Sequence, residues 1–170
     1  MRLKDLIEDC PEEAGEIEIT SLAVKSSQAQ NGSMFFALKG VKNDGGEYIE
    51  EAIKNGAVCV ISEKDCCGFG AVAIKVSDDR IALARISARF YGNPQIGMKF
   101  VGITGTNGKT TTSYMIRSIL RAAGEKTGII GTLGAFIDDE PVAFTDMTTP
   151  DPPELFGILA KMKSAGVTHV

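Results

Sequence analysis

Residues 99–112 read Lys99-Phe100-Val101-Gly102-Ile103-Thr104-Gly105-Thr106-Asn107-Gly108-Lys109-Thr110-Thr111-Thr112. The apolar first part predicts a strand, the glycines predict a turn, and the residues from Lys109 onward predict a helix. Because glycine lacks a Cβ, Gly102, Gly105 and Gly108 can take positive φ angles and let successive backbone N–H groups face an anion. This order of elements indicates a phosphate-binding loop.

The side chains that follow the turn suit a nucleoside triphosphate such as ATP or GTP. Lys109 supplies a mobile positive charge, and the first turn of the helix presents unpaired N–H groups at the positive end of its dipole. The Thr110 hydroxyl can ligate the accompanying Mg²⁺. The spacing is a variant of the common pattern, since five residues rather than four separate Gly102 from Gly108.

The composition narrows the class of protein. The chain has 170 residues, of which 44% are hydrophobic and 24% are charged, as in an ordinary soluble globular protein. A net charge of −4, with scattered Lys and Arg, argues against a nucleic-acid or membrane surface. The spacing of the cysteines does not match a zinc site. The first ten residues include three acidic residues, which excludes a secretory signal peptide. We expect a cytoplasmic monomer with idle thiols.

Short apolar runs alternate with helical patterns, which predicts an α/β fold. Strands are expected at 34–38, 57–61, 71–76, 99–103 and 127–131, and helices at 48–54, 79–91, 109–123 and 153–164. Asn93-Pro94 interrupts the pattern, so we place a domain boundary there, between a small domain at 1–95 and a second at 96–170. A further strand begins at Val167 and stops at Val170, so we expect the second, mostly parallel-sheet domain to be the front portion of a longer protein.

Two helices carry finer expectations. The helix after the glycine turn should direct five apolar side chains inward: Met115, Ile116, Ile119, Leu120 and Ala123. The last helix should begin with Asp151 as its cap and Pro152 at its first position.

Two other features could be mistaken for catalytic groups. Asp138-Asp139-Glu140 might suggest a metal site, but the following Pro141 favours a solvated hairpin tip. His169, the single histidine, is expected to be structural rather than a catalytic base.

Several motifs together resemble those of the Mur ligases. The loop Gly105–Thr112, preceded by Arg89-Phe90-Tyr91-Gly92-Asn93-Pro94, is similar to the ATP loop and interdomain hinge of that family. Asp146-Met147-Thr148-Thr149-Pro150 resembles an element of its UDP-N-acetylmuramoyl-tripeptide synthetases. Ser33-Met34-Phe35-Phe36-Ala37-Leu38-Lys39-Gly40 resembles their uridine-binding domain. Lys25-Ser26-Ser27 departs from the family's usual Asp-Ser-Arg.

The resemblance implies an ATP-dependent ligase of peptidoglycan synthesis. Such an enzyme adds a diamino acid, meso-diaminopimelate or lysine, to UDP-N-acetylmuramoyl-L-alanyl-D-glutamate through an acyl phosphate. The implied ATP-binding residues are Gly105, Thr106, Asn107, Gly108, Lys109, Thr110 and Thr111, with Lys109 catalytic and Mg²⁺ at Thr110. The implied substrate contacts are Val24, Ser26, Val41, Lys42, Asn43, Thr148 and Thr149. The family's later acidic ligand, modified lysine and third domain lie beyond these residues, so we expect this chain alone to be inactive.

Two other functions remain open. The chain could be a non-catalytic UDP-sugar module that uses its glycine loop as an anion clamp. It could also resemble a folylpolyglutamate synthase, which shares the loop but should lack the block from Ser33 to Ala57. Thr148 and Thr149 could cap a helix instead of binding a substrate.

Overall fold

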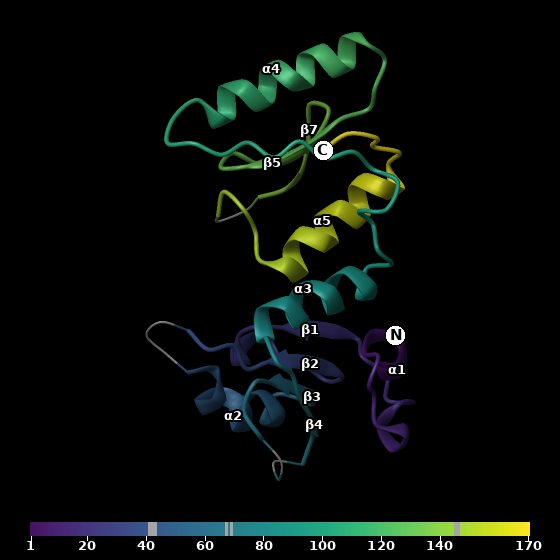
Figure 1. The fold of residues 1–170 in the computed structure, drawn as a ribbon, viewed down its shortest axis with the longest axis vertical. Coiled ribbons are helices and arrows are strands. Elements are labelled where there is room, and N and C mark those ends of the chain that lie inside the picture. The colour runs from purple at the N-terminus through teal and green to yellow at the C-terminus, as the bar shows by residue number, and fades with distance from the viewer. Residues whose placement is uncertain (41–43, 67, 69, 145–146) are drawn as a thin grey trace. The chain divides into compact units, whose positions relative to one another are not determined.

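The computed structural model describes residues 1–40, 44–66, 68, 70–144 and 147–170. They form two compact units, Met1–Phe90 and Tyr91–Val170, which Figure 1 colours from purple to teal and from teal to yellow. Among these residues, no helix combines the length and the apolar character that a membrane crossing requires.

The first unit is built on a parallel four-stranded sheet. Its strands lie in the order β1 (Ser21–Ala23), β2 (Ser33–Phe36), β3 (Ala57–Ser62) and β4 (Val72–Lys75). Every residue of β2 is buried, and so are five of the six in β3. Continuous burial is what a parallel sheet covered on both faces requires, and it explains the unbroken apolar runs in the sequence.

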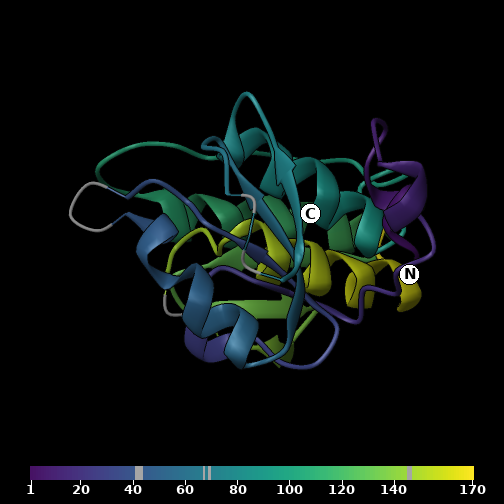
Figure 2. The same cartoon turned by 90° about the horizontal axis from the view of Figure 1, so that it is seen from below.

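Helices cover both faces of this sheet. α1 (Leu3–Leu6) and α3 (Asp79–Phe90) pack against one face, in a core with Met34 and Phe36. α2 (Ile49–Lys54) packs against the other face, with Phe35 and Val60, and Figure 2 shows α1 and α2 on opposite sides of the strands. Three short 3₁₀ helices complete the unit: η1 (Glu12–Ala14), η2 (Ser26–Gln28) and η3 (Gly45–Tyr48).

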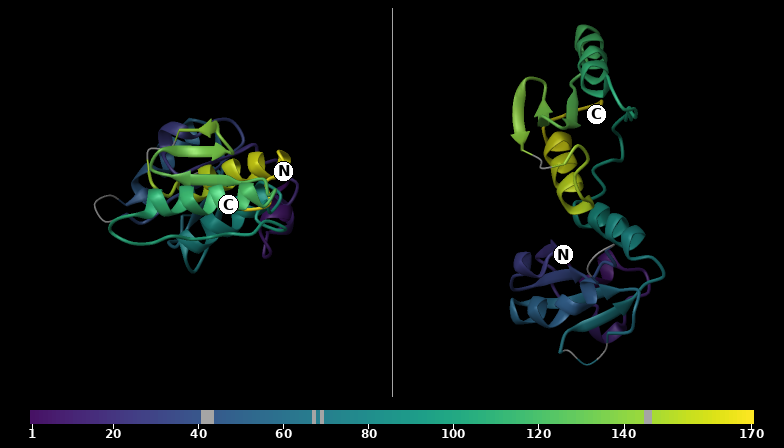
Figure 3. Two further views of the ribbon diagram at one scale, coloured as in Figure 1. Left: turned by 90° about the horizontal axis from the view of Figure 1, so that it is seen from above. Right: turned by 90° about the vertical axis from the view of Figure 1, so that its left-hand side faces the viewer.

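The second unit combines an antiparallel meander with parallel single-residue bridges. The meander is β5 (Gly128–Gly131), β6 (Gly134–Ile137) and β7 (Glu140–Ala143). His169 forms parallel bridges to both Thr127 and Lys99, so the last residues of the chain lie between two earlier segments. Figures 1 and 3 show α4 (Lys109–Ala122) and α5 (Pro152–Ser164) on opposite sides of the strands.

Two local expectations were only partly correct. The segment expected as a strand at 99–103 pairs with residues 168–170 through the N–H groups of Lys99 and Val101, but only Lys99 forms a β-bridge. Asp151 stands at the N-cap position of α5, as expected, but makes no side-chain cap bond. Pro153, at the second position of the helix, has no N–H, so one of the two donors from which an N-cap side chain can accept is missing.

The inward face expected of α4 is also only partly correct. Ile116 and Leu120 are half-buried, but Met115 is 61% exposed and Ile119 is 69% exposed, and Ala123 is exposed as well. A helix presents an apolar stripe about 100° wide, and here only half of that stripe faces the sheet. The inner side of α4 also carries Arg117, whose side chain is only 12% exposed.

Close packing at Gly45 yields a stability prediction. A Cβ at Gly45 would lie 2.6 Å from main-chain atoms of Ala37 and Leu38, which cannot yield as a flexible side chain would. Gly45→Ala should therefore cost about 1–3 kcal/mol of the free energy of unfolding, measured by urea titration with circular dichroism. Gly15→Ala is the matched control, since its Cβ would make contacts no closer than 3.4 Å. Equal stability of the two variants would contradict the expectation.

Glu125 gives a pH-dependent prediction. Its carboxylate accepts the Thr168 hydroxyl at 2.7 Å, and this bond, then the charges of His169 and Lys99, lowers its pKa below the usual 4.5. A lowered pKa in the folded state stabilises the protein fully above the unfolded value and is lost as the pH falls through the folded value. Wild type should therefore melt at a higher temperature than Glu125→Gln at pH 7, and the difference should shrink as the pH falls below 4.5 and disappear once the pH is below the lowered pKa of the folded state. A pH-independent difference would argue against this ion pair.

Candidate functional site

The glycine loop of the second unit is open to solvent. Gly105 and Gly108 have φ angles of +146° and +80°, and Gly108 is the N-cap residue of α4. Gly102 does not have a positive φ, although its lack of a Cβ would permit one. A Cβ at Gly102 or Gly108 would meet nothing within 4 Å, so there is open space beside both glycines.

The backbone of this loop is suited to an anion. Within the described chain, no N–H group from Gly105 to Thr111 donates a hydrogen bond to another backbone group; the first is that of Thr112, to Gly108. Lys109 folds back so that its Nζ donates to the carbonyl of Gly105 at 2.5 Å. Unpaired N–H groups beside a lysine at a helix N-terminus form a site that fits a polyphosphate. The loop residues and the Thr110 hydroxyl therefore fit Mg·ATP.

A cavity of about 460 Å³ adjoins the loop. It is lined by Lys109 and Thr110 from α4, and by Thr148 and Thr149 from the segment before α5. The structure thus brings two separately predicted sets of residues, for ATP and for substrate, to one cavity. The remaining predicted loop residues, Gly105 to Gly108, lie beside it in the exposed turn.

Thr132 is a lining residue that the sequence did not single out. It follows β5 and exchanges a hydrogen bond with Thr148, with their hydroxyl oxygens 3.0 Å apart. Its setting between two glycines, Gly131 and Gly134, marks a turn but nothing specific to a site. Only the proximity to Thr148 identifies it.

The acidic turn between β6 and β7 is a hairpin tip, as expected, but its acids are paired. Asp139 accepts from Arg117 at 2.8 Å and from Arg121 at 2.7 Å. The Asp138 carboxylate accepts from the N–H and the hydroxyl of Thr127. These side chains therefore join the turn to α4 and β5.

The predicted substrate residues of the first unit have structural contacts of their own. The buried Ser26 donates its hydroxyl to Glu51 at 2.8 Å, and its carbonyl accepts from Asn55 at 2.9 Å. Val24 is half-buried against the core. Val41, Lys42 and Asn43 lie outside the described residues.

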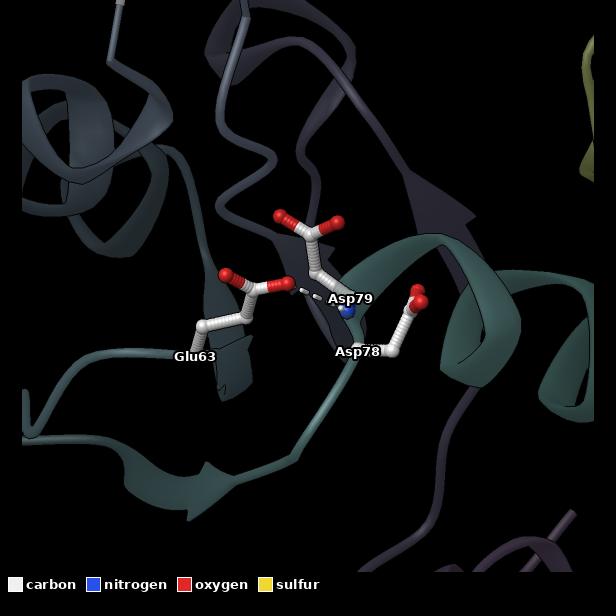
Figure 4. A group of neighbouring side chains, drawn as sticks. All are labelled: Glu63, Asp78 and Asp79. Atoms are coloured by element: carbon white, nitrogen blue, oxygen red, sulfur yellow. Dashed lines mark hydrogen bonds between the residues drawn. The ribbon is translucent and has the colours of Figure 1, made fainter.

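One group of three carboxylates could be mistaken for a metal centre: Glu63, Asp78 and Asp79 (Figure 4). Asp78 accepts from the N–H of Ile81 at 2.8 Å, and Glu63 accepts from the N–H of Asp79 at 3.2 Å. Asp79 is 3% exposed, and its carboxylate accepts from the N–H of Lys39 at 2.8 Å. The three acids therefore satisfy the start of α3 and the end of the β2 region, which accounts for them without a metal.

The remaining candidates are His169 and the cysteines. His169 lines the cavity and forms parallel bridges to Lys99 and Thr127. Its Nδ1 lies 3.3 Å from the Glu125 carboxylate. Cys59 and Cys66 are buried, and burial raises the pKa of Cys59 to about 12, which keeps this thiol protonated and unreactive.

Comparisons with known families match nearly the whole chain. The Mur ligase middle domain matches residues 103–170, and the domain described as Mur ligase family, catalytic domain, matches residues 18–91.

Two relatives carry the name UDP-N-acetylmuramoyl-L-alanyl-D-glutamate–2,6-diaminopimelate ligase. The one from Caldanaerobacter subterraneus subsp. tengcongensis is 38% identical over 100% of this chain and 36% of its own length. The one from Brucella melitensis is 42% identical over 99% of this chain and 35% of its own length. The chain thus spans about a third of these relatives.

Solved structures show the same fold. A structure of a ligase with that same name superposes with a TM-score of 0.78 at 23% identity, covering 99% of this chain and 34% of the other. The MurF ligase from Thermotoga maritima in complex with ADP gives a TM-score of 0.55 at 27% identity, covering 82% of this chain and 28% of the other.

Proposed function

The chain belongs to the Mur ligase family, and we propose that it forms part of an ATP-dependent ligase that joins diaminopimelate to UDP-N-acetylmuramoyl-L-alanyl-D-glutamate. The observation that carries this proposal is the shared cavity, where Lys109 and Thr110 lie with Thr148 and Thr149. The names of relatives at 38% and 42% identity support diaminopimelate as the amine. The reaction belongs to peptidoglycan synthesis in the cytoplasm, where ATP is available.

The reaction needs two anions to approach each other. A substrate carboxylate attacks the γ-phosphate of ATP, ADP leaves, and an amine then displaces phosphate from the acyl phosphate to form the amide. Positioning and charge neutralisation dominate such a step. Mg²⁺ at Thr110 would supply further positive charge between the phosphate oxygens.

This chain's residues have distinct parts in the proposal. The N–H groups of Gly105–Thr111 hold the phosphates, and Lys109 leaves the Gly105 carbonyl to bridge the phosphate oxygens. Thr148, oriented by Thr132, and Thr149 contact the muramoyl-peptide substrate. Val24, Ser26 and residues 41–43 contribute to the UDP site. Ser26 acts through its backbone N–H, because Glu51 holds its hydroxyl and Asn55 donates to its carbonyl.

Removing the lysine tests the proposal. Lys109→Ala should lower the ligase turnover of the full-length protein by about a hundredfold or more, because one strong electrostatic stabiliser is lost. Release of ADP in the presence of both substrates is the measurement. Lys161→Ala, an exposed lysine of α5, is the control and should keep its rate. A near-normal rate for Lys109→Ala would refute the assigned role.

UDP binding separates this proposal from a folylpolyglutamate synthase. The purified chain should bind both UDP and Mg·ADP, with resonances of the first unit shifting for UDP and those of the loop Gly105–Thr111 shifting for Mg·ADP. Binding of Mg·ADP but not of UDP would favour the hypothesis of a folylpolyglutamate synthase. Binding of both ligands by a full-length protein without ligase activity would favour a binding module.

A further inference from the structure

Apolar packing fixes α4 to its sheet only in part. No residue of this helix is fully buried, and the cavity of about 460 Å³ runs along its inner side, lined by Ile116 and Leu120. The hydrogen bonds by which described residues of α4 reach the strand region come from two arginines, and they gather at the turn between β6 and β7.

Two arginines one helical turn apart hold this turn. Arg117 donates to the carbonyl of Asp138 and to Oδ1 of Asp139, and Arg121 donates to Oδ2 of Asp139. Both carboxylate oxygens of Asp139 are thereby occupied. We call Arg117, Arg121, Asp138 and Asp139 the turn clamp.

The turn is itself fixed to the sheet. Asp138 has a φ of +49°, a conformation that is uncommon for non-glycine residues but that Asp adopts more readily than most. Its carboxylate accepts from the N–H of Thr127 at 3.3 Å and from the hydroxyl at 3.1 Å. The turn clamp therefore links α4 directly to the residue that precedes β5.

The burial of Arg117 distinguishes this cluster from an ordinary surface ion pair, although the Asp139 side chain is 64% exposed. The Arg117 side chain is 12% exposed, and its guanidinium lies over the ring of Tyr114 at 4.7 Å from the ring centre. Isolated exposed pairs contribute little, whereas a nearly buried guanidinium depends on its partners. The carboxylate of Asp139 is the charge that compensates it.

We propose that the turn clamp sets the position of α4 over the sheet, so that Arg117 and Asp139 are positioning residues for phosphate binding at the opposite end of the helix. Arg117 lies eight residues after Lys109, a span of about 12 Å along a helix axis. Over that lever a tilt of about 5° moves Lys109 and Thr110 by roughly 1 Å, enough to spoil hydrogen bonds to phosphate oxygens. The inference rests on the proposed nucleotide site.

The test compares the wild-type 170-residue chain with four variants. Asp139→Asn keeps the shape of the side chain and removes its charge, and Arg117→Met removes the guanidinium but keeps an unbranched side chain. Glu140→Gln is the matched control, because it removes one negative charge from the adjacent exposed residue, outside the turn clamp. Titration with Mg·ADP, followed by amide resonances, measures affinity, and amide hydrogen exchange measures the stability of α4 and α5 separately.

Asp139→Asn and Arg117→Met should each weaken Mg·ADP binding about tenfold and accelerate exchange in α4, with α5 unchanged. Glu140→Gln should leave both properties within twofold of wild type. Unchanged exchange in α4 would overturn the turn clamp, and faster exchange with unchanged affinity would overturn its positioning role.

The proposed nucleotide site is judged separately. Failure of the unmodified chain to bind Mg·ADP would refute that site, and the positioning role with it, whatever the exchange data show. Arg117→Lys is a milder variant that controls for misfolding. Lysine keeps the positive charge opposite Asp139, but its ammonium group cannot bind Asp139 and the Asp138 carbonyl together as a guanidinium does. Its affinity should fall between those of wild type and Arg117→Met, and an affinity equal to that of Arg117→Met would contradict the role of charge.

Discussion

The second unit depends on a short parallel ladder formed by the last three residues of the chain. On one side, Lys99 donates to the carbonyl of Thr168 at 2.9 Å, and Val170 donates to the carbonyl of Lys99 at 2.8 Å. On the other side, Thr168 donates to Lys126 at 2.9 Å, and Gly128 donates to His169 at 2.8 Å. Segments about 30 to 70 residues apart in the sequence are joined by this ladder. Because parallel strands end at one edge, the glycine loop after Val101 and the turn after β5 open at the same edge, where ligands of α/β sheets bind.

At that edge, the glycine loop presents backbone N–H groups that can bind an anion. Backbone N–H groups are normally paired, and those from Gly105 to Thr111 lack backbone partners in the described chain. Lys109 meanwhile donates to a carbonyl of the same loop. A polyphosphate would satisfy the donors and release the lysine at once. In the described chain these donors have no competing backbone partner, so they are available to an anion.

Much of the architecture could be predicted from local patterns. The strands β2, β3 and β4 and the helices α3, α4 and α5 lie within two residues of their expected positions, because apolar periodicity and glycine punctuation are properties of each segment alone. β1, β6 and β7 were not predicted, because β1 has only three residues and the antiparallel pair β6 and β7 is defined by its pairing rather than by an apolar run. Thr132 escaped notice for the same reason, as its relation to Thr148 spans sixteen residues.

The sequence by itself determined the chemistry of the loop: glycines where the backbone must turn, a lysine, and a threonine at the start of a helix. It also determined which residues form the apolar runs of a covered parallel sheet. Only the tertiary structure decided that Thr148 shares a cavity with Lys109, and that Arg117 faces Asp139 rather than solvent. The physical reason is that hydrogen bonds and ion pairs between distant segments depend on where the strands place those segments. The type of a side chain does not specify how far it lies from its partner in the folded protein.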